Sequence, residues 1–259
     1  SALNLALSIS DLKNKEVILP SMSFVSMAHA VILNGAKPIF VDIDSNSLCI
    51  DPEKIKKSIT KKTAAILPVH FGGMACNLTE IMKICNDNNL IMIEDAAHAA
   101  GTSYKNQKIG KHGMAVCFSF HPVKNLSMPT GGLISINHKD YKKIKKNLNS
   151  KRWCGITDRK DAQYDVKEMG WNYYMDEFSA AIGLEQLKKL EKLNKKRKKI
   201  AKKYSEQINL ERKMPFSSEC SYHLFWIRTK NRRRLRKNLS ELGIETGIHY
   251  RPIHTMTMY

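Results

Sequence analysis

The sequence lacks the patterns of a disulfide- or metal-stabilised fold. Its six cysteines are scattered along the chain and form no CxxC pair. Such scattered cysteines indicate reduced thiols in a cytoplasmic protein rather than a disulfide framework or a zinc site. The nine histidines have no metal-ligand spacing, so we expect no bound metal.

Long hydrophobic runs are also missing, and acidic residues are few. No segment is long and apolar enough for a membrane span, and there is no signal peptide, so we expect no membrane association. The chain has 24 acidic against 43 basic residues and a net charge of +19. Such an excess can attract nucleic acid or other anions. Because the lysines concentrate in helical stretches such as residues 188–204 and no nucleic-acid motif accompanies them, we expect solvated helix faces and no nucleic-acid partner.

Several common catalytic motifs are absent. The sequence contains no GxGxxG, no P-loop, no GxSxG and no HExxH, which argues against dinucleotide binding, P-loop phosphoryl transfer, serine hydrolysis and zinc proteolysis. The chain begins at Ser1, directly on a helical pattern, and stops at "HTMTMY" without a closing element. We therefore expect a fragment that lacks both ends.

Short apolar runs alternate with amphipathic stretches over the first two-thirds of the chain. The runs are bounded by turn-forming residues and are typical of buried strands. This alternation predicts an α/β fold, with a mostly parallel sheet sandwiched by helices. The expected strands lie in residues 16–20, 37–43, 64–70, 90–96, 115–120 and 132–137, and the expected helices in 23–36, 51–60 and 77–89.

The pattern changes at Asp176. One long helical pattern follows, with apolar residues three and four apart. A strand at 221–229 ("SYHLFWIRT") and a basic helix at 231–243 are expected after it. We predict a large α/β domain over residues 1–190, and over 191–259 a linking long helix with the start of a smaller α+β domain.

Two groups stand out at strand ends. Asp95 closes the apolar run "LIMIED", and Lys124 comes just after the run "AVCFSF". Ligands of open α/β sheets bind at the carboxyl ends of strands. Taken alone, Asp95 is equally consistent with a helix cap, and Lys124 with an ordinary solvated lysine. Together they are the two groups that pyridoxal phosphate needs: an amine for the Schiff base and a carboxylate for the pyridinium nitrogen.

The phosphate of such a cofactor needs hydrogen-bond donors. Ser119 lies five residues before Lys124, and Ser1 and Ala2 begin a helical pattern with free amides. Phe24, after the first expected strand, could stack on the cofactor ring, although a core aromatic is as consistent with the sequence alone.

At this point the residues match a known family. The chain resembles the sugar aminotransferases of the DegT/DnrJ/EryC1/StrS family, which have the aspartate-aminotransferase type of PLP fold. The resemblance covers essentially the whole chain, and its most specific segments are "EDAAHA" and "SFHPVKN". One departure is "SMPTGGL", where many members have an acidic residue before the two glycines.

The resemblance implies a role for individual residues. Lys124 would form the Schiff base, Asp95 would pair with the pyridinium nitrogen, and His98 would flank the ring near its phenolic oxygen. Asn172 would reach the phosphate of a neighbouring subunit, which implies a homodimer with shared active sites. The remaining positions are Phe24 for ring stacking, Ser119, Ser1 and Ala2 for the phosphate, and His249, Tyr250 and His254 near the sugar substrate.

The resemblance also implies a reaction. An amino-acid donor, expected to be L-glutamate, would give its amino group to the cofactor, and a nucleotide-diphosphate keto-sugar, expected to be a 4-keto-6-deoxy sugar, would receive it. The product would serve the biosynthesis of a polysaccharide or glycoconjugate precursor. Two alternatives stay open: another PLP enzyme of the same fold type, such as an amino-acid aminotransferase, and a non-catalytic basic binding or regulatory protein.

Overall fold

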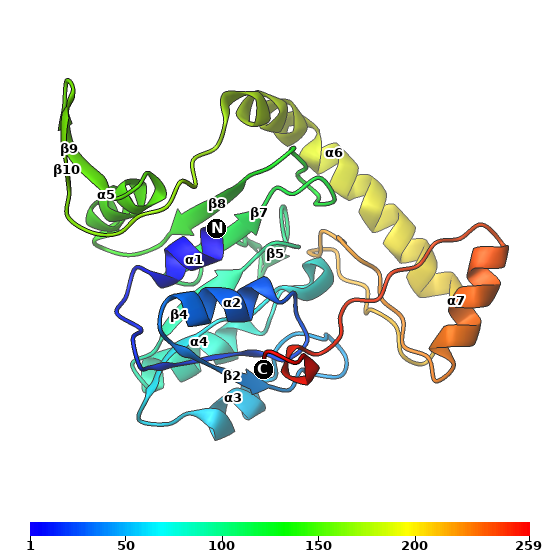
Figure 1. Ribbon diagram of the computed structural model, residues 1–259. Helices are drawn as coiled ribbons and strands as arrows, with labels where there is room; N and C mark the ends of the chain where they lie inside the picture. The colour runs from blue at the N-terminus through cyan, green and yellow to red at the C-terminus, as the bar shows by residue number, and fades with distance from the viewer.

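A six-stranded sheet forms the centre of the protein, whose computed structural model describes residues 1–259 (Figure 1). Its strand order is β2-β1-β3-β4-β7-β8. All neighbouring strands are parallel except β7 and β8, which are antiparallel. Each expected strand of the first two-thirds is present, as β1 (Glu16–Pro20), β2 (Lys37–Val41), β3 (Thr63–Ile66), β4 (Ile91–Asp95), β7 (Ala115–Ser119) and β8 (Gly132–Ile136).

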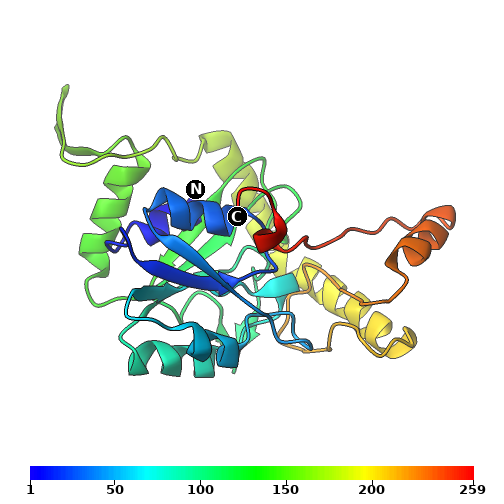
Figure 2. The ribbon, with the colours of Figure 1, turned by 60° about the horizontal axis from the view of Figure 1, so that its bottom comes forward.

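Helices cover both faces of this sheet, which confirms the expected fold class. α1 (Ala2–Leu7) and α2 (Ser26–Leu33) lie on one face, and α3 (Pro52–Ser58) and α4 (Leu78–Asp87) on the other (Figure 2). Side-chain N-caps stabilise the first turns of α3 and α4. The side chains of Asp51 and Asn77 accept hydrogen bonds from backbone N–H groups of the first turns of α3 and α4, respectively. A core of 35 buried apolar residues fills the layers.

Small elements were not expected from the sequence. A single 3₁₀ turn, η1 (Phe71–Gly73), follows β3, and β5 (Ser103–Tyr104) pairs with β6 (Gln107–Lys108). After α5 (Tyr141–Arg152), an antiparallel hairpin of β9 (Ile156–Lys160) and β10 (Gln163–Val166) extends away from the sheet (Figure 1).

The second part of the chain begins with the long helix α6 (Glu177–Gln207), which the sequence predicts. It starts where the Ser179 N–H donates to Asp176 Oδ1 at 2.8 Å. The helix runs without a break across residue 190, and the division into domains 1–190 and 191–259 stays a prediction.

The strand expected at 221–229 is wrong. This segment contains only one isolated bridge, between Lys213 and Ile227. Its apolar residues pack against α6 instead, since Cys220 and Tyr222 form a small buried cluster with Ala201 and Met214. The predicted basic helix is present as α7 (Arg232–Glu241).

The last residues return to the sheet. The Ile253 N–H, in η2 (Ile253–Thr255), donates to the carbonyl of Ser21, just after β1, at 2.7 Å. The Tyr259 ring meets the Phe40 ring edge-on, with 5.6 Å between centroids. Residues 249–259 therefore lie beside the carboxyl ends of the strands. None of the helices combines the length and apolarity that crossing a membrane requires.

Candidate active site

Asp95 and Lys124 come together at the carboxyl edge of the sheet. Asp95 is the last residue of β4, and Lys124 lies in the loop that follows β7, the parallel neighbour of β4. The Lys124 N–H donates to the His121 carbonyl at 2.8 Å, which closes a tight turn right after the strand. Each group affects the ionisation of the other. The adjacent strand ends thus bring one carboxylate and one amine to the same place.

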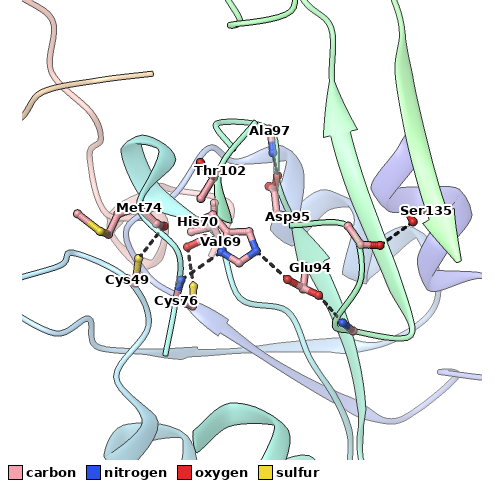
Figure 3. Close-up of polar contacts among 12 residues, drawn as sticks. Cys49, Val69, His70, Met74, Cys76, Glu94, Asp95, Ala97, Thr102 and Ser135 are labelled. Carbon is pink, nitrogen blue, oxygen red and sulfur yellow. Dashed lines mark hydrogen bonds and ion pairs between the residues drawn. The ribbon is translucent and has the colours of Figure 1, made fainter. Parts of the chain in front are cut away.

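Asp95 is a buried carboxyl group with few partners. Its Oδ1 accepts a hydrogen bond from the Ala97 N–H at 2.9 Å (Figure 3), and the side chain forms no ion pair within the chain. Burial raises the pKa of this carboxyl above its usual value, and the Ala97 hydrogen bond and the charge of Lys124 oppose that rise. A cation placed against the carboxylate would remove this cost.

The Lys124 amine is half-buried and makes no hydrogen bond or ion pair within the chain. Burial lowers its pKa, and the attraction of Asp95 counteracts part of that effect. A lysine with a lowered pKa has more neutral amine near pH 7, and only the neutral amine is a nucleophile or a base.

His98 lies three residues after Asp95 and is also buried. Its Nδ1 accepts from the Gly72 N–H at 3.2 Å, so the hydrogen of the neutral ring is on Nε2, which lies 3.3 Å from the hydroxyl of Tyr250. Burial, together with the charge of Lys124, lowers the pKa of His98 to about 2. His98 is therefore a neutral hydrogen-bond donor beside the lysine.

Aromatic rings form one wall beside these groups. The Tyr250 ring lies 6.1 Å from that of Phe24 and 6.1 Å from that of Phe71, measured between centroids. The Phe24 side chain is 59% exposed, so its ring is open to a ligand. His249 precedes Tyr250 and its pKa is lowered by burial and by Lys124, whereas His254 is exposed on η2.

The residues expected at the phosphate lie near one another at the end of β7. Ser119 pairs with Gly132 of β8, and a Cβ added at Gly132 would lie 3.7 Å from the Cβ of Ala2. The Ser119 hydroxyl accepts weakly from the His121 N–H at 3.4 Å, and Ser1 is the exposed N-cap residue of α1. This corner thus holds a hydroxyl and the free amides of the first turn of α1.

Asn172 lies apart from this group. It bridges to Trp153, just after α5, and is exposed to solvent. The next residue, Tyr173, accepts a hydrogen bond from the Asn4 side chain of α1 at 3.3 Å. The segment that contains Asn172 is therefore bound to α1, the helix at the expected phosphate site, and the Asn172 side chain faces solvent.

Two residues at the site were missed from the sequence. Asn125, next to Lys124, is buried, and His223 stacks on His98 with 4.3 Å between ring centroids. The signal for His223 was its position as an ionisable residue inside the apolar run "SYHLFW". The sequence predicts a strand for that run, and this prediction does not give the direction of the His223 side chain.

A second buried network lies directly beside the site. Glu94 Oε2 is 2.8 Å from His70 Nε2, and Glu94 Oε1 accepts from the Gly113 N–H (Figure 3). The Cys76 N–H donates to His70 Nδ1 at 3.1 Å, so Nε2 carries the hydrogen that Glu94 accepts. Glu94 and His70 thus satisfy each other within the chain.

Comparisons with known proteins show the family and the fold of the chain. The sequence matches the DegT/DnrJ/EryC1/StrS aminotransferase family over residues 1–259. It is 35% identical to the uncharacterized protein MJ1066 of Methanocaldococcus jannaschii, over 100% of this chain and 72% of that protein.

Two solved structures have the same fold over nearly the whole chain. One is Helicobacter pylori PseC, an aminotransferase involved in the biosynthesis of pseudoaminic acid, with a TM-score of 0.90, 26% identity, and coverage of 100% of this chain and 73% of PseC. The other is NtdA of Bacillus subtilis with bound cofactor PMP, with a TM-score of 0.89, 31% identity, and coverage of 99% and 60%. The chain belongs to the DegT/DnrJ/EryC1/StrS aminotransferase family.

Proposed function

We propose that this PLP-dependent sugar aminotransferase transfers an amino group from an amino acid, L-glutamate, to a nucleotide-diphosphate keto-sugar. The observation that carries this proposal is the pairing of a buried, under-satisfied Asp95 with a half-buried Lys124 at adjacent strand ends. An aromatic cation fits beside such a carboxylate, and an aldehyde fits beside such an amine. PMP, the aminated form of the same cofactor, is bound in NtdA.

The residues present fit the cofactor. Asp95 would hold the pyridinium nitrogen, Phe24 would cover the ring, and His98 would flank the ring near its phenolic oxygen. Ser119, with Ser1 and Ala2, would bind the phosphate. When bound, the cofactor supplies an electron sink that makes the α-hydrogen of an amino acid acidic.

Lys124 would have two tasks in this site. Its neutral amine would condense with the aldehyde of the cofactor and release one water. Once the amino group of the donor has displaced it, the free amine would take up the proton from the α-carbon of the donor. The lowered pKa of Lys124 supports both tasks, because each needs the amine without its extra proton.

The sugar substrate is supported by family membership and by the role of PseC in pseudoaminic acid biosynthesis. His249, Tyr250 and His254 would contact the sugar, and a 4-keto-6-deoxy sugar is the acceptor we propose. The product would enter polysaccharide or glycoconjugate precursor biosynthesis in the cytoplasm.

We also propose a homodimer in which Asn172 reaches the phosphate site of the partner subunit. The support is the exposure of large apolar side chains on either side of Asn172 in the sequence, over residues 169–184, because exposed apolar patches are typical of interfaces. They include Met169, Phe178 and Leu184, which are 82%, 84% and 65% exposed.

The decisive experiment has two stages. The protein is mixed with PLP, reduced with borohydride and digested, and mass spectrometry locates the modified lysine, which we expect to be Lys124. A panel of nucleotide keto-sugars is then offered with L-glutamate, and 2-oxoglutarate is measured. Labelling of a different lysine would overturn the site. Turnover with amino-acid keto acids but with no keto-sugar would instead identify an amino-acid aminotransferase.

A further inference from the structure

The side-chain amide of Asn125 has a fixed orientation. Asn125 is buried, and its Nδ2 donates to Asn194 Oδ1 on α6 and to the Ser221 carbonyl, both at 3.0 Å. Asn194 Nδ2 in turn donates to the Ala100 carbonyl at 2.9 Å. Because both hydrogens of the Asn125 amide are used, its oxygen is the atom that faces His223 Nδ1, at 3.2 Å.

This orientation determines the state of the His223 ring. A carbonyl oxygen can only accept, so His223 Nδ1 carries the hydrogen. In the neutral ring, Nε2 is then a bare acceptor, and it makes no hydrogen bond within the chain. Asn125, the residue next to Lys124 in the sequence, thus imposes the less common tautomer of His223, with the hydrogen on Nδ1.

The His223 ring is stacked on the ring of His98. The centroids are 4.3 Å apart and the planes are inclined by 29°. At the edge of the ring, His98 Nε2 faces the hydroxyl of Tyr250 at 3.3 Å, with 6.4 Å between the two ring centroids. His98 therefore has His223 on one face, the Gly72 N–H at its Nδ1 and the Tyr250 hydroxyl at its Nε2.

We infer that His223 is a positioning residue: held by Asn125, its ring stacks on His98 and keeps the Nε2–H of His98 directed at the edge where Tyr250 lies. The inference rests on the proposed function, because it assigns a positioning role for the same reaction. His223 does not touch the reacting atoms in this assignment. It acts through His98 and through the loop that carries Lys124.

The charges around the two rings favour this arrangement. Lys124 and His249 face both histidines, and Arg197 of α6 faces His223. Burial and these cationic neighbours lower the pKa of His223 to about 3. No carboxylate contributes to the shift of either histidine. Since a proton on either ring would be buried beside Lys124, both rings stay neutral and stack without mutual repulsion.

The test measures the hydrogen positions directly, by nitrogen NMR of ¹⁵N-histidine protein in the PLP-loaded and PLP-free forms. We expect neutral rings from about pH 8 to about pH 5, with the hydrogen on Nδ1 of His223 and on Nε2 of His98. His98→Gln and His223→Gln assign the two signals. Asn125→Leu should let the His223 hydrogen move to Nε2, and a wild-type His223 with its hydrogen on Nε2 would overturn the inference.

Two substitutions separate ring packing from hydrogen bonding. His223→Phe keeps a flat ring against His98, so His98 should stay neutral over the same pH range. His223→Ala removes the ring and admits water, so the pKa of His98 should rise from about 2 towards its usual value of 6.5. An unchanged His98 titration in His223→Ala would refute the positioning role.

Kinetics give the second readout. His223→Ala should reduce kcat for amine transfer by up to about a hundredfold, as expected for a displaced reacting group, and His223→Phe by much less. A purely structural role would lower the unfolding temperature of both variants and leave the His98 titration and kcat unchanged. If the wild type transfers no amine to any acceptor but the NMR result holds, the proposed function fails and the arrangement of His223 and His98 stands.

Discussion

Glu94 and Asp95 are neighbours on β4, and both are buried, yet the chain treats them differently (Figure 3). Glu94, on one side of the strand, has His70 and the Gly113 N–H as partners. Asp95, on the other side, has the Ala97 N–H alone and no ion pair. Successive residues of a strand point to opposite faces of the sheet, so these two neighbouring carboxylates lie in different environments.

The difference shows which carboxylate is structural and which is available to a ligand. A buried carboxylate costs free energy unless donors or a cation compensate it. The His70 ring and the Gly113 N–H compensate the burial of Glu94. Asp95 has no such pair of partners, and burial raises its pKa. A buried carboxylate without an ion-pair partner at a strand end therefore indicates a ligand site. Substitution of Asp95 should reduce activity more than stability, and substitution of Glu94 should reduce stability more than activity.

The largest effect is expected for Lys124→Ala. In the proposed mechanism, loss of the amine removes both the bond to the cofactor and the proton carrier, so single-turnover amine transfer should fall by roughly a hundredfold to ten-thousandfold. The unfolding temperature should change little because Lys124 lies in a loop. Lys111→Ala, an exposed loop lysine before β7, is the matched control. Near-normal transfer by Lys124→Ala would mean that a different lysine is the reactive one.

Asp95→Asn should come next. Asparagine keeps the size and removes the negative charge, so a bound pyridinium would lose its proton and become a weaker electron sink. The proton-transfer step should slow by about a hundredfold or more, as for the loss of one well-placed electrostatic contact. Stopped-flow absorbance of the PLP-loaded protein with glutamate measures this rate. A normal rate with normal cofactor binding would make Asp95 a helix-cap residue only.

Glu94→Gln should show the opposite pattern. An amide at this position places an N–H against His70 or Gly113, both of which are donors, so the folded state should lose about 1–3 kcal/mol. Amine transfer per folded molecule should stay close to normal. Urea unfolding of Glu94→Gln and Asp95→Asn, measured side by side, checks the order. The comparison fails if Asp95→Asn proves the less stable of the two.

The smallest effect, for a change of one pH unit, concerns the buried ring of His98. The pKa of His98 is about 2 in the folded chain, against an ordinary value of 6.5 in the unfolded chain. Below pH 6.5 the unfolded chain binds a proton that the folded chain does not, so the free energy of unfolding is highest above pH 6.5 and declines as the pH falls. The loss should be about 1.4 kcal/mol per pH unit below that value.

Urea midpoints of the wild type and His98→Gln between about pH 7 and pH 4.5 measure it, since the variant should lose less stability on acidification. The raised pKa of Asp95 acts in the opposite direction, so the difference between the two proteins is the useful quantity. Parallel pH curves for both proteins would contradict the buried, neutral state of His98.

Much of this arrangement could be predicted from local sequence. The strand ending at Asp95 and the strand before Lys124 are continuous apolar runs, and parallel neighbours end at the same edge of a sheet. The caps at Asp51, Asn77 and Asp176 follow from short-range hydrogen bonding. The assignment of Glu94 to a closed network could not be predicted in this way, because His70 lies 24 residues away.

The failures have a common physical cause. The run containing His223 is rich in aromatic and apolar residues, which is typical of a strand. It forms only one isolated bridge, at Ile227, and apolar residues in and beside it pack against α6. Asn125 has no local signal at all, since its partners Asn194 and Ser221 are 69 and 96 residues away. The conformations of His223 and Asn125 depend on contacts with residues far away in the sequence. The periodicity of a short segment carries no information about such contacts.

The return of residues 249–253 to the sheet edge has a consequence for how the site forms. Tyr250 contacts His98 across 152 positions of sequence, and Ile253 binds the backbone at Ser21. Contacts of such separation are slow to form, because a long loop must close before any of them is gained. During synthesis, the strands that carry Asp95 and Lys124 leave the ribosome well before Tyr250 does. An immature chain therefore exposes the Lys124 amine before Tyr250 is in place, and the proposed active site is complete only when this last contact has been made.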